Sequence, residues 1–315
     1  MILTPTAIFQ EKEEAAAPPA AGLLIDDVGV DAVLAFGLRK LRNAYTGDAI
    51  QVRRASDNAT QDIGFSGEDL DTSALATFCA GTNGYIRTWY DQSGNGNDFS
   101  QTTNGLQALI YDSTAGTVTN SNGNVACRTT ELGDTASTGD YVYQSNTFSA
   151  NKTPTVCMVK EFITHNGSGI SHAEAGNGFA MGTYGATYSG CRTISSSGGI
   201  LITYGGIALG ESFAIMNFLN DDGGIGNAFM IGSSDGGIGQ GGTLALNTET
   251  YTASNFNAPT YDQIQLFYCC APSLYQNMYF SEYVFWDIST ANTSLSTSEQ
   301  QAYFDNINAY YTFIF

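Results

Sequence analysis

Short runs in which apolar and polar residues alternate cover most of the chain and predict β-strands. From residue 49 onward these runs are separated by Gly, Asn, Asp and Ser, with turn dipeptides such as Asn122-Gly123. The strand candidates are residues 50–52, 85–90, 107–111, 141–143, 154–162, 178–182, 199–204, 212–218, 228–232, 263–270 and 277–286. Strands in this number predict an all-β fold, and we expect a two-sheet jelly-roll sandwich.

Two segments show the apolar spacing of an α-helix. Near the start, Asp31 and Gly47 frame apolar residues at helical intervals, which predicts a helix over about residues 30–45. Near the end, Ser296 and Glu299 match a capping box, in which the hydroxyl and the carboxylate accept hydrogen bonds from the first backbone amides of a helix. The apolar face that follows predicts a C-terminal helix over about residues 297–311.

The first 24 residues differ in composition from the rest. Four mostly acidic residues, 11–14, precede an Ala-rich stretch with Pro18-Pro19, which is typical of an extended linker. We therefore expect an N-terminal docking arm over residues 1–24 and a jelly-roll domain over residues 25–315. The alternative is a tail that folds back on its own domain. The apolar residues expected to dock the arm on a partner are Ile2, Leu3, Ile8 and Phe9.

Charge excludes several classes of partner. The 315 residues include 11 Lys and Arg against 30 Asp and Glu, a net charge of −19. This argues against binding to nucleic acid or to anionic lipid, which need a basic surface. We find no apolar stretch long enough to span a membrane and no features of a secretory signal, so we expect a cytoplasmically made chain with reduced cysteines. Cys269-Cys270 leaves a vicinal disulfide open as an alternative.

A family resemblance becomes visible between residues 33 and 101. The matching segments, in chain order, are 36–47, 49–57, 62–65, 70–71, 78–79 and 88–96, and Tyr90-Asp91-Gln92-Ser93-Gly94-Asn95-Gly96 is the most specific of them. This order resembles the catalytic domain of the arabinofuranosidase B family of glycoside hydrolases. The resemblance implies a concanavalin A-like (LamG-like) sandwich. Domains of this kind with short N-terminal arms are also similar to head or tail fibre proteins of tailed bacteriophages.

The resemblance implies a catalytic pair that the sequence does not reveal. A retaining glycosidase needs two carboxylates about 5–5.5 Å apart. Residues 263–281, where the resemblance places the acid, contain no carboxylate. Glu161, Glu174 and His172 are candidates, but no spacing joins them into a pair, so a structural role is the favoured interpretation and we assign no catalytic residue.

Three hypotheses follow. The first is a structural, non-enzymatic virion protein, docked through its arm on a capsid or tail component, with host-glycan binding by the jelly roll. Because Lys and Arg are absent after Arg192, sheet edges lack charges that block association, and we expect a homo-oligomer, by fibre analogy a trimer. The alternatives are an arabinofuranosidase-type glycoside hydrolase and a standalone lectin-like carbohydrate-binding module.

Two further groups are candidate binding sites. Asp91, Ser93, Asn95 and Asp98 alternate like the first half of a calcium-binding loop, although a hairpin braced by Asx hydrogen bonds explains the same residues. We otherwise expect no cofactor. The candidates for accepting sugar hydroxyls, with acidic turn residues as the structural alternative, are Asp221, Asp222 and Asp235.

Overall fold

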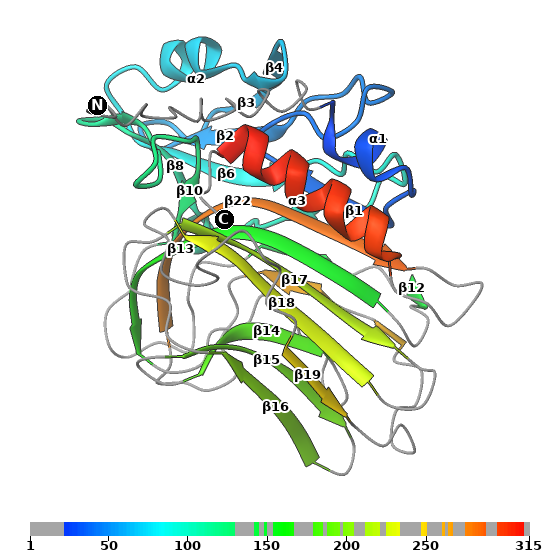
Figure 1. Cartoon of the computed structure of the whole chain (residues 1–315). Coiled ribbons are helices and arrows are strands. Elements are labelled where there is room, and N and C mark those ends of the chain that lie inside the picture. The colour runs from blue at the N-terminus through cyan, green and yellow to red at the C-terminus, as the bar shows by residue number, and fades with distance from the viewer. Residues whose placement is uncertain are drawn as a thin grey trace, which may run out of the picture.

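The computed structural model is an all-β protein with a few short helices (Figure 1). It describes residues 22–129, 142–144, 148–149, 154–166, 179–184, 188–195, 198–204, 212–220, 225–233, 247–250, 260–261, 264–266, 275–287 and 295–311. Every strand pairing in these ranges is antiparallel. No helix in the described ranges has the length and apolar content needed to cross a membrane.

The helices and strands of the described residues have the following bounds. The helices are α1 (Leu24–Val28), α2 (Thr72–Phe78), the 3-10 turn η1 (Asn104–Leu106) and α3 (Thr297–Tyr311). The strands before residue 150 are β1 (Leu34–Gly37), β2 (Ile50–Arg54), β3 (Thr60–Ile63), β4 (Phe65–Ser66), β5 (Asp69–Leu70), β6 (Gly84–Trp89), β7 (Phe99–Ser100), β8 (Leu109–Asp112), β9 (Gly116–Thr117), β10 (Cys127–Arg128), β11 (Val142–Gln144) and β12 (Phe148–Ser149). The later strands are β13 (Pro154–Asn166), β14 (Phe179–Tyr184), β15 (Tyr188–Ser195), β16 (Gly198–Tyr204), β17 (Ser212–Asn220), β18 (Ile225–Ser233), β19 (Asn247–Thr250), β20 (Thr260–Tyr261), β21 (Ile264–Leu266) and β22 (Tyr275–Asp287).

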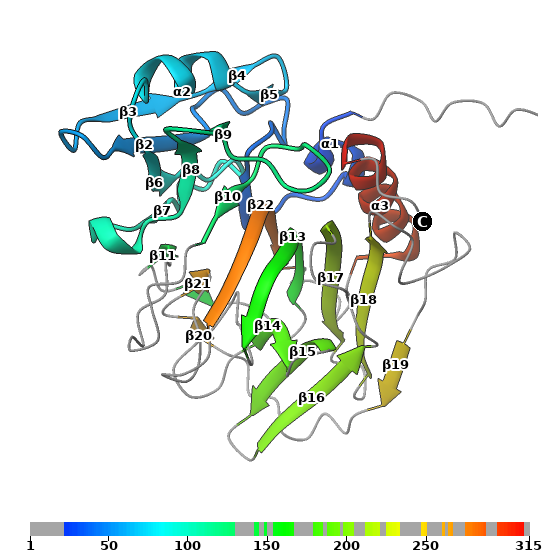
Figure 2. The same ribbon diagram turned by 90° about the vertical axis from the view of Figure 1, so that its left-hand side faces the viewer.

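A large sheet organises the molecule around its two longest strands. Its strand order is β19-β18-β17-β13-β22-β10-β8-β6-β7-β11-β21, with β1 added along β22 and β2 along β6. β13 and β22 pair from Pro154–Asp287 to Asn166–Tyr275, with two register shifts. A smaller sheet, β14-β15-β16, lies at the opposite end of the molecule from α2 (Figure 2). Long-range pairing between the two ends of the chain thus builds the centre of the fold.

Both faces of the central strands are buried. Val284 and Trp286 of β22 pack with α1 and α3 in what we call the helix core, whereas Tyr283 and Phe285 pack on the other face in the strand core. This alternation follows from the two-residue repeat of a strand. Trp89 and Trp286, which have the bulk to stack on sugars, are instead completely buried, so aromatic burial here stabilises the fold.

The predicted helix over residues 30–45 is wrong. Residues 34–37 form β1, all four of them buried, which pairs with β22 from Leu34–Phe285 to Gly37–Glu282. The helix lies earlier, as α1, and ends at Gly29, whose left-handed backbone (φ 73°) closes its last turn. A strand buried on both faces carries a continuous apolar run, and in a short window that run has the same residue types as a buried helix.

The C-terminal helix is confirmed with its cap. The backbone amide of Ser296 donates to Glu299 Oε2 at 2.6 Å, and the amide of Glu299 donates to Ser296 Oγ at 3.4 Å. Tyr303, Ile307 and Tyr311 are buried in the helix core. At the other end of the chain, Leu23 and Leu24 fall within the predicted arm but are buried, so the packed domain begins before residue 25.

Candidate functional site

The family-like motif at residues 90–96 is a set of side chains that bind backbone. Asp91 accepts four hydrogen bonds: Oδ1 from the amides of Ala35 and Ser93, both at 2.9 Å, and Oδ2 from Ser93 Oγ at 2.7 Å and the amide of Asn97 at 3.1 Å. The bond from the Ser93 amide, two residues further along the chain, is the local bond of an Asx turn. The bond to Ala35 reaches across 56 positions and fixes the motif against β1.

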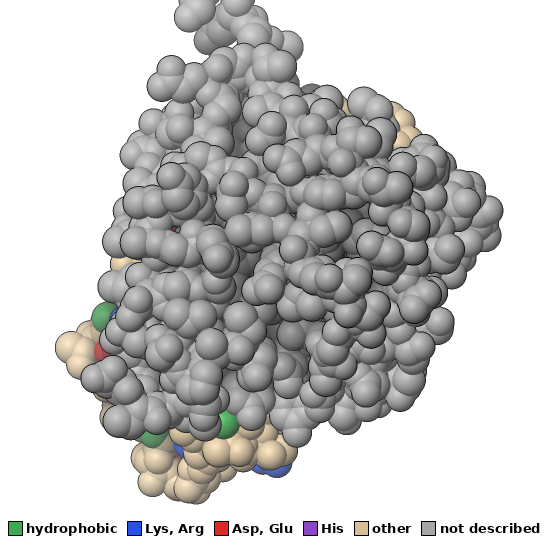
Figure 3. Space-filling view, turned by 90° about the horizontal axis from the view of Figure 1, so that it is seen from below, with side chains coloured by type: hydrophobic (Ala, Val, Ile, Leu, Met, Phe, Trp, Pro, Cys, Tyr) green, Lys and Arg blue, Asp and Glu red, His purple; other side chains and the backbone are tan. Residues whose placement is uncertain are grey.

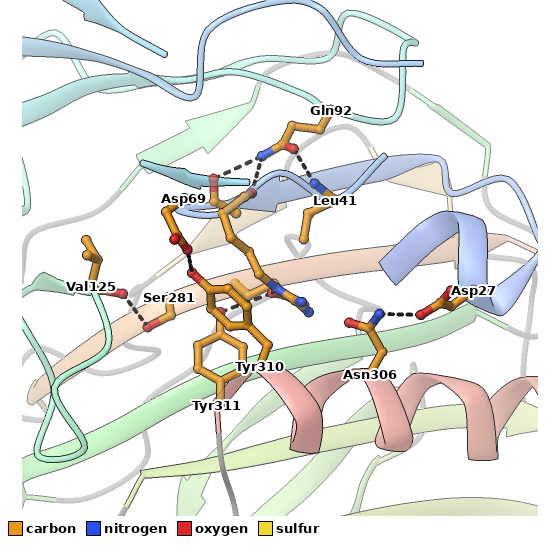
Figure 4. Close-up of polar contacts among 12 residues, drawn as sticks. Asp27, Leu41, Asp69, Gln92, Val125, Ser281, Asn306, Tyr310 and Tyr311 are labelled. Atoms are coloured by element: carbon orange, nitrogen blue, oxygen red, sulfur yellow. Dashed lines mark hydrogen bonds and ion pairs between the residues drawn. The ribbon is translucent and has the colours of Figure 1, made fainter. Parts of the chain in front are cut away.

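Gln92 continues this contact from a completely buried position. Its Nε2 donates to the carbonyl oxygens of Gly37 at 2.9 Å and Arg39 at 3.0 Å, and its Oε1 accepts from the amide of Leu41 at 2.8 Å. Figure 4 shows the amide between these groups. A buried backbone group without a hydrogen-bond partner is costly. The Gln92 side chain supplies that partner to three backbone groups, at the end of β1 and just after it, which do not bond to a neighbouring strand.

Two further motif side chains reach the start of β1. Ser93 Oγ, whose one proton goes to Asp91 Oδ2, lies 3.1 Å from the Val33 carbonyl oxygen, and Asn95 Nδ2 donates to the carbonyls of Ala32 and Val33 at 3.2 and 3.0 Å. Together with Asp91 and Gln92, these contacts define a backbone clamp made by residues 91–95 on residues 32–41. The clamp holds the segment that carries Arg39.

Arg39 lies at the centre of a buried polar cluster. Its Nε donates to Glu282 Oε2 on β22 at 2.8 Å, and the two side chains are 3% and 1% exposed. Burial alone would lower the pKa of Arg39, but the attraction and hydrogen bond of Glu282, together with Tyr311 and Tyr310, outweigh it, so the pKa is raised overall. Replacing either partner would leave the other charge buried without compensation.

The end of α3 closes over this ion pair. The Arg39 guanidinium lies 4.4 Å from the ring centroid of Tyr310 and 5.3 Å from that of Tyr311, within the range of cation–π attraction. Tyr310 Oη donates to Asp69 at 2.5 Å and Tyr311 Oη to Glu282 at 3.1 Å (Figure 4). Burial raises the pKa of both hydroxyls. The cluster joins α3 to β22 and β5, and its groups are engaged with one another.

A second polar group lies near β2 and β3. Tyr90 Oη donates to Asp62 Oδ1 at 2.7 Å, and Tyr45 Oη donates to the Asp48 carbonyl at 2.7 Å. Burial, with Asp98 and Asp48 nearby, raises the pKa of Tyr45 to about 12. Burial raises the pKa of Asp98, while the hydrogen bond from the Asp91 amide lowers it and the charge of the Asp91 carboxylate raises it by a smaller amount. These acids therefore repel one another across a partly exposed surface.

The calcium candidates all lie in this part of the motif. Asp91 is saturated by protein donors, Asn95 directs its amide nitrogen to β1, and Asp98 Oδ1 accepts from the Asp91 amide at 2.9 Å. These contacts are those of the braced hairpin. Across the described residues, no three His, Cys, Asp or Glu side chains group as a metal site would require. The braced hairpin stays the favoured interpretation of Asp91, Ser93, Asn95 and Asp98, and calcium binding there stays a hypothesis to be tested.

The other predicted site residues are mostly outside the described ranges. Glu161 is described: it is buried on β13, and its Oε2 accepts from the amide and the hydroxyl of Ser121 at 2.9 and 2.8 Å. On the face seen in Figure 3, described side chains reach the surface only along the rim. The candidates outside the described residues are Ile2, Leu3, Ile8, Phe9, His172, Glu174, Asp221, Asp222 and Asp235, together with Cys269 and Cys270. Among described cysteines, Cys79, Cys127 and Cys157 are buried thiols.

The sequence could not reveal the clamp or the Arg39 cluster as units. The motif letters identify residues 90–96, but not that their side chains bind backbone about 50 to 60 positions away. Arg39 and Glu282 lie 243 positions apart and carry no local pattern. The one available signal is that Arg39 directly follows the apolar run at residues 32–38, which implies a buried partner once that run is known to contain a buried strand.

The structure defines the class of this protein as an all-β antiparallel domain with a side-chain clamp on its first strand. Residues 28–191, more than half of the chain, match the family model described as alpha-L-arabinofuranosidase B, catalytic. The chain therefore belongs to the arabinofuranosidase B catalytic-domain family. The matched range contains the whole clamp.

Individual relatives agree with this assignment over shorter spans. Alpha-L-arabinofuranosidase B of Penicillium canescens is 46% identical over 76 residues, which are 23% of this chain and 16% of that protein. The protein of the same name from Emericella nidulans is 42% identical over 86 residues, covering 25% and 17%. The matched segment thus spans about one sixth of the length of these relatives.

Solved structures show the same fold over most of the chain. A GH54 α-L-arabinofuranosidase soaked with a cyclic sulfate inhibitor has a TM-score of 0.63 and 18% identity, covering 91% of this chain and 64% of that one. An arabinofuranosidase complexed with arabinofuranosyl-α-1,2-xylobiose has a TM-score of 0.62, 19% identity and the same coverage. At this identity the likeness establishes the fold.

The family corrects the functional expectations. The predicted structural virion protein is wrong, because the family model, the curated relatives named above and the two solved structures named above are arabinofuranosidases. The same finding overturns the non-enzymatic interpretation, the capsid or tail partner, the fibre-like trimer and the virion location. Residues 263–281 contain no carboxylate, but this absence is weaker evidence about function than the match at residues 90–96.

Proposed function

We propose that this chain is a glycoside hydrolase that cleaves α-L-arabinofuranosides. The observation that supports this most directly is the family match over residues 28–191. Structural neighbours of the same fold are described with 4-nitrophenyl α-L-arabinofuranoside and with an arabinofuranosyl xylobiose. The substrate proposed for this chain is accordingly an arabinofuranosyl group on a small aryl or sugar aglycone.

The proposed chemistry uses two carboxyl groups. One attacks the anomeric carbon or activates water, and the other protonates the leaving oxygen. Several acids of the described structure have structural partners that account for them: Asp91 in the clamp, Glu282 with Arg39, and Asp57 with Arg54. We propose that the catalytic pair is drawn from other acids, and the first to test are Glu174, Asp221, Asp222 and Asp235, with Glu161 tested beside them even though it accepts two hydrogen bonds from Ser121.

The three turn acids also serve a second proposed role. Asp221, Asp222 and Asp235 would accept hydrogen bonds from sugar hydroxyls if they are not the catalytic pair. Loss of such an acceptor weakens substrate binding, whereas loss of a catalytic carboxyl lowers the rate at saturation. The two roles therefore separate in kcat and KM.

The test is release of 4-nitrophenol from 4-nitrophenyl α-L-arabinofuranoside by the full chain and by single amide variants. The variants are Glu161→Gln, Glu174→Gln, Asp221→Asn, Asp222→Asn and Asp235→Asn, with Asp57→Asn as the matched surface control. We expect the wild type to hydrolyse the glycoside and two positions to lose about 10³-fold or more in kcat. Asp57→Asn should keep full activity.

Two outcomes would overturn the proposal. A folded wild-type chain that leaves the arabinofuranoside intact at every enzyme concentration would exclude the hydrolase function. Calorimetric binding of arabinose oligosaccharides without hydrolysis would favour the lectin-like module instead. Full activity in all five variants would leave hydrolysis standing but refute the proposed choice of acids.

A further inference from the structure

The hairpin between β2 and β3 carries an exposed asparagine in an unusual backbone conformation. The turn is closed by hydrogen bonds from the Arg54 amide to the Ala59 carbonyl at 3.0 Å and from the Asn58 amide to the Arg54 carbonyl at 3.1 Å. Asn58 has φ 60° and is exposed. Asn tolerates this left-handed region better than most residues, so the turn places its side chain outward at little cost.

Arg53 fixes which way the Asn58 amide faces. Asn58 Oδ1 accepts from Arg53 Nη1 at 2.9 Å and from Asn104 Nδ2 at 3.1 Å. A guanidinium only donates hydrogen bonds, so the amide atom that faces Arg53 must be the oxygen. Asn58 Nδ2 is therefore the atom left over, and in the described part of the chain it makes no hydrogen bond.

Arg53 itself is held firmly. It is 6% exposed, its Nε donates to Gln107 Oε1 at 2.6 Å, and its guanidinium lies 5.0 Å from the Tyr85 ring centroid. Its third contact is to the Asn104 carbonyl at 3.3 Å. The orientation of the Asn58 amide thus depends on a buried, multiply bonded cation and not on a mobile surface group.

Asn58-Ala59-Thr60 is an Asn-x-Thr triplet, the acceptor sequence for N-linked oligosaccharides. We propose that Asn58 is an N-glycan acceptor whenever the chain enters the endoplasmic reticulum of a eukaryotic cell. The co-reactant is an oligosaccharide linked to a lipid pyrophosphate. Asn58 Nδ2 forms a bond to the anomeric carbon and loses one proton, and the pyrophosphate leaves with the electrons of the broken C–O bond.

The structure accommodates the product as well as the acceptor. The glycosylated amide keeps its carbonyl oxygen, so both hydrogen bonds to Asn58 Oδ1 persist. The sugar would extend from Nδ2 at the exposed end of the hairpin. An Asn-x-Thr triplet also begins at Asn151 and Asn-x-Ser triplets begin at Asn166 and Asn292, whose side chains the structure does not describe.

The experiment secretes the full chain from yeast behind a cleavable leader, with a C-terminal tag that carries one proven acceptor triplet. Peptide-N-glycosidase treatment in water labelled with heavy oxygen converts each glycosylated Asn into labelled Asp, which peptide mass spectrometry locates. We expect the Asn58 peptide to be labelled in the wild type and in Thr60→Ser. It should be unlabelled in Thr60→Ala, which keeps Asn58 but destroys the triplet.

Folding is controlled separately from modification. Thr60 is exposed on β3, so we expect Thr60→Ala and Thr60→Ser to have the same urea midpoint as unmodified wild type. Label on the tag but none at Asn58 in secreted, folded protein would overturn the proposal. Label that survives Thr60→Ala would overturn it equally, since it could not come from the triplet.

Discussion

Arg39 and Glu282 form an ion pair that joins the two ends of the chain inside the protein, with Nε and Oε2 2.8 Å apart. Breaking a buried pair by removing one partner costs about 3–5 kcal/mol, because the remaining charge keeps its desolvation penalty. We expect Arg39→Met and Glu282→Leu each to lower the free energy of unfolding by this amount. Urea denaturation followed by tryptophan fluorescence measures it.

The double variant is the control for this interpretation. Arg39→Met with Glu282→Leu removes both charges, so its cost should be clearly smaller than the sum of the single variants. Additive effects would mean that the two charges do not stabilise each other. Asp31→Asn, which removes the exposed carboxylate that pairs with Arg42 and leaves the bond from Arg42 to the Ser93 carbonyl, should cost at most about 1 kcal/mol.

Gln92 should contribute more to the free energy of unfolding than an uncharged side chain usually does. Gln92→Leu leaves the Arg39 carbonyl and the Leu41 amide without these partners and leaves the Gly37 carbonyl only its 3.4 Å bond from Trp89 Nε1. Each such group costs about 1–3 kcal/mol, so we expect a loss of about 3 kcal/mol or more in unfolding free energy. Gln51→Leu, at a partly exposed amide that bonds to Asp62, is the matched control and should change stability little. Equal effects at both positions would refute the clamp.

Particular residues show which parts of the structure can be predicted from the sequence. The capping box at Ser296 and Glu299 predicted α3 because its signal is local. Residues 85–90 predicted β6 for the same reason. The local pattern predicts a helix at β1, because this segment becomes a strand only by pairing with β22, about 250 positions away. Likewise, Tyr90-Asp91-Gln92-Ser93 identified the family, but its physical role lies in contacts to residues 32–41 that no local pattern encodes.

Alkaline pH should destabilise the protein through Cys79. Burial raises the pKa of this thiol from 9.0 to about 11. Above the pKa of the unfolded state the unfolded thiol ionises while the folded one stays neutral, so stability falls as pH rises from about 9 toward 11. We expect the slope of unfolding free energy against pH in this window to be shallower in Cys79→Ala. Identical slopes would show that Cys79 does not contribute.

Calcium binding at the motif can be decided by thermal unfolding. Because the Asp91 carboxylate already accepts four protein hydrogen bonds, we expect EDTA to leave Tm unchanged. A ligand that binds only the folded state raises Tm. Because we expect no calcium site at the motif, excess calcium chloride should also leave Tm unchanged. A rise in Tm with calcium in the wild type that is lost in Asp98→Asn would establish a site and contradict this expectation.

The most direct measurement is proton NMR of 4-nitrophenyl α-L-arabinofuranoside incubated with the full chain. Family membership leads us to expect the anomeric signal of the glycoside to disappear as signals of free arabinose grow, in proportion to enzyme concentration. The corresponding β-D-xylopyranoside should remain intact as the control. An arabinofuranoside spectrum that does not change in the presence of folded protein would contradict the assignment of this chain as a hydrolase.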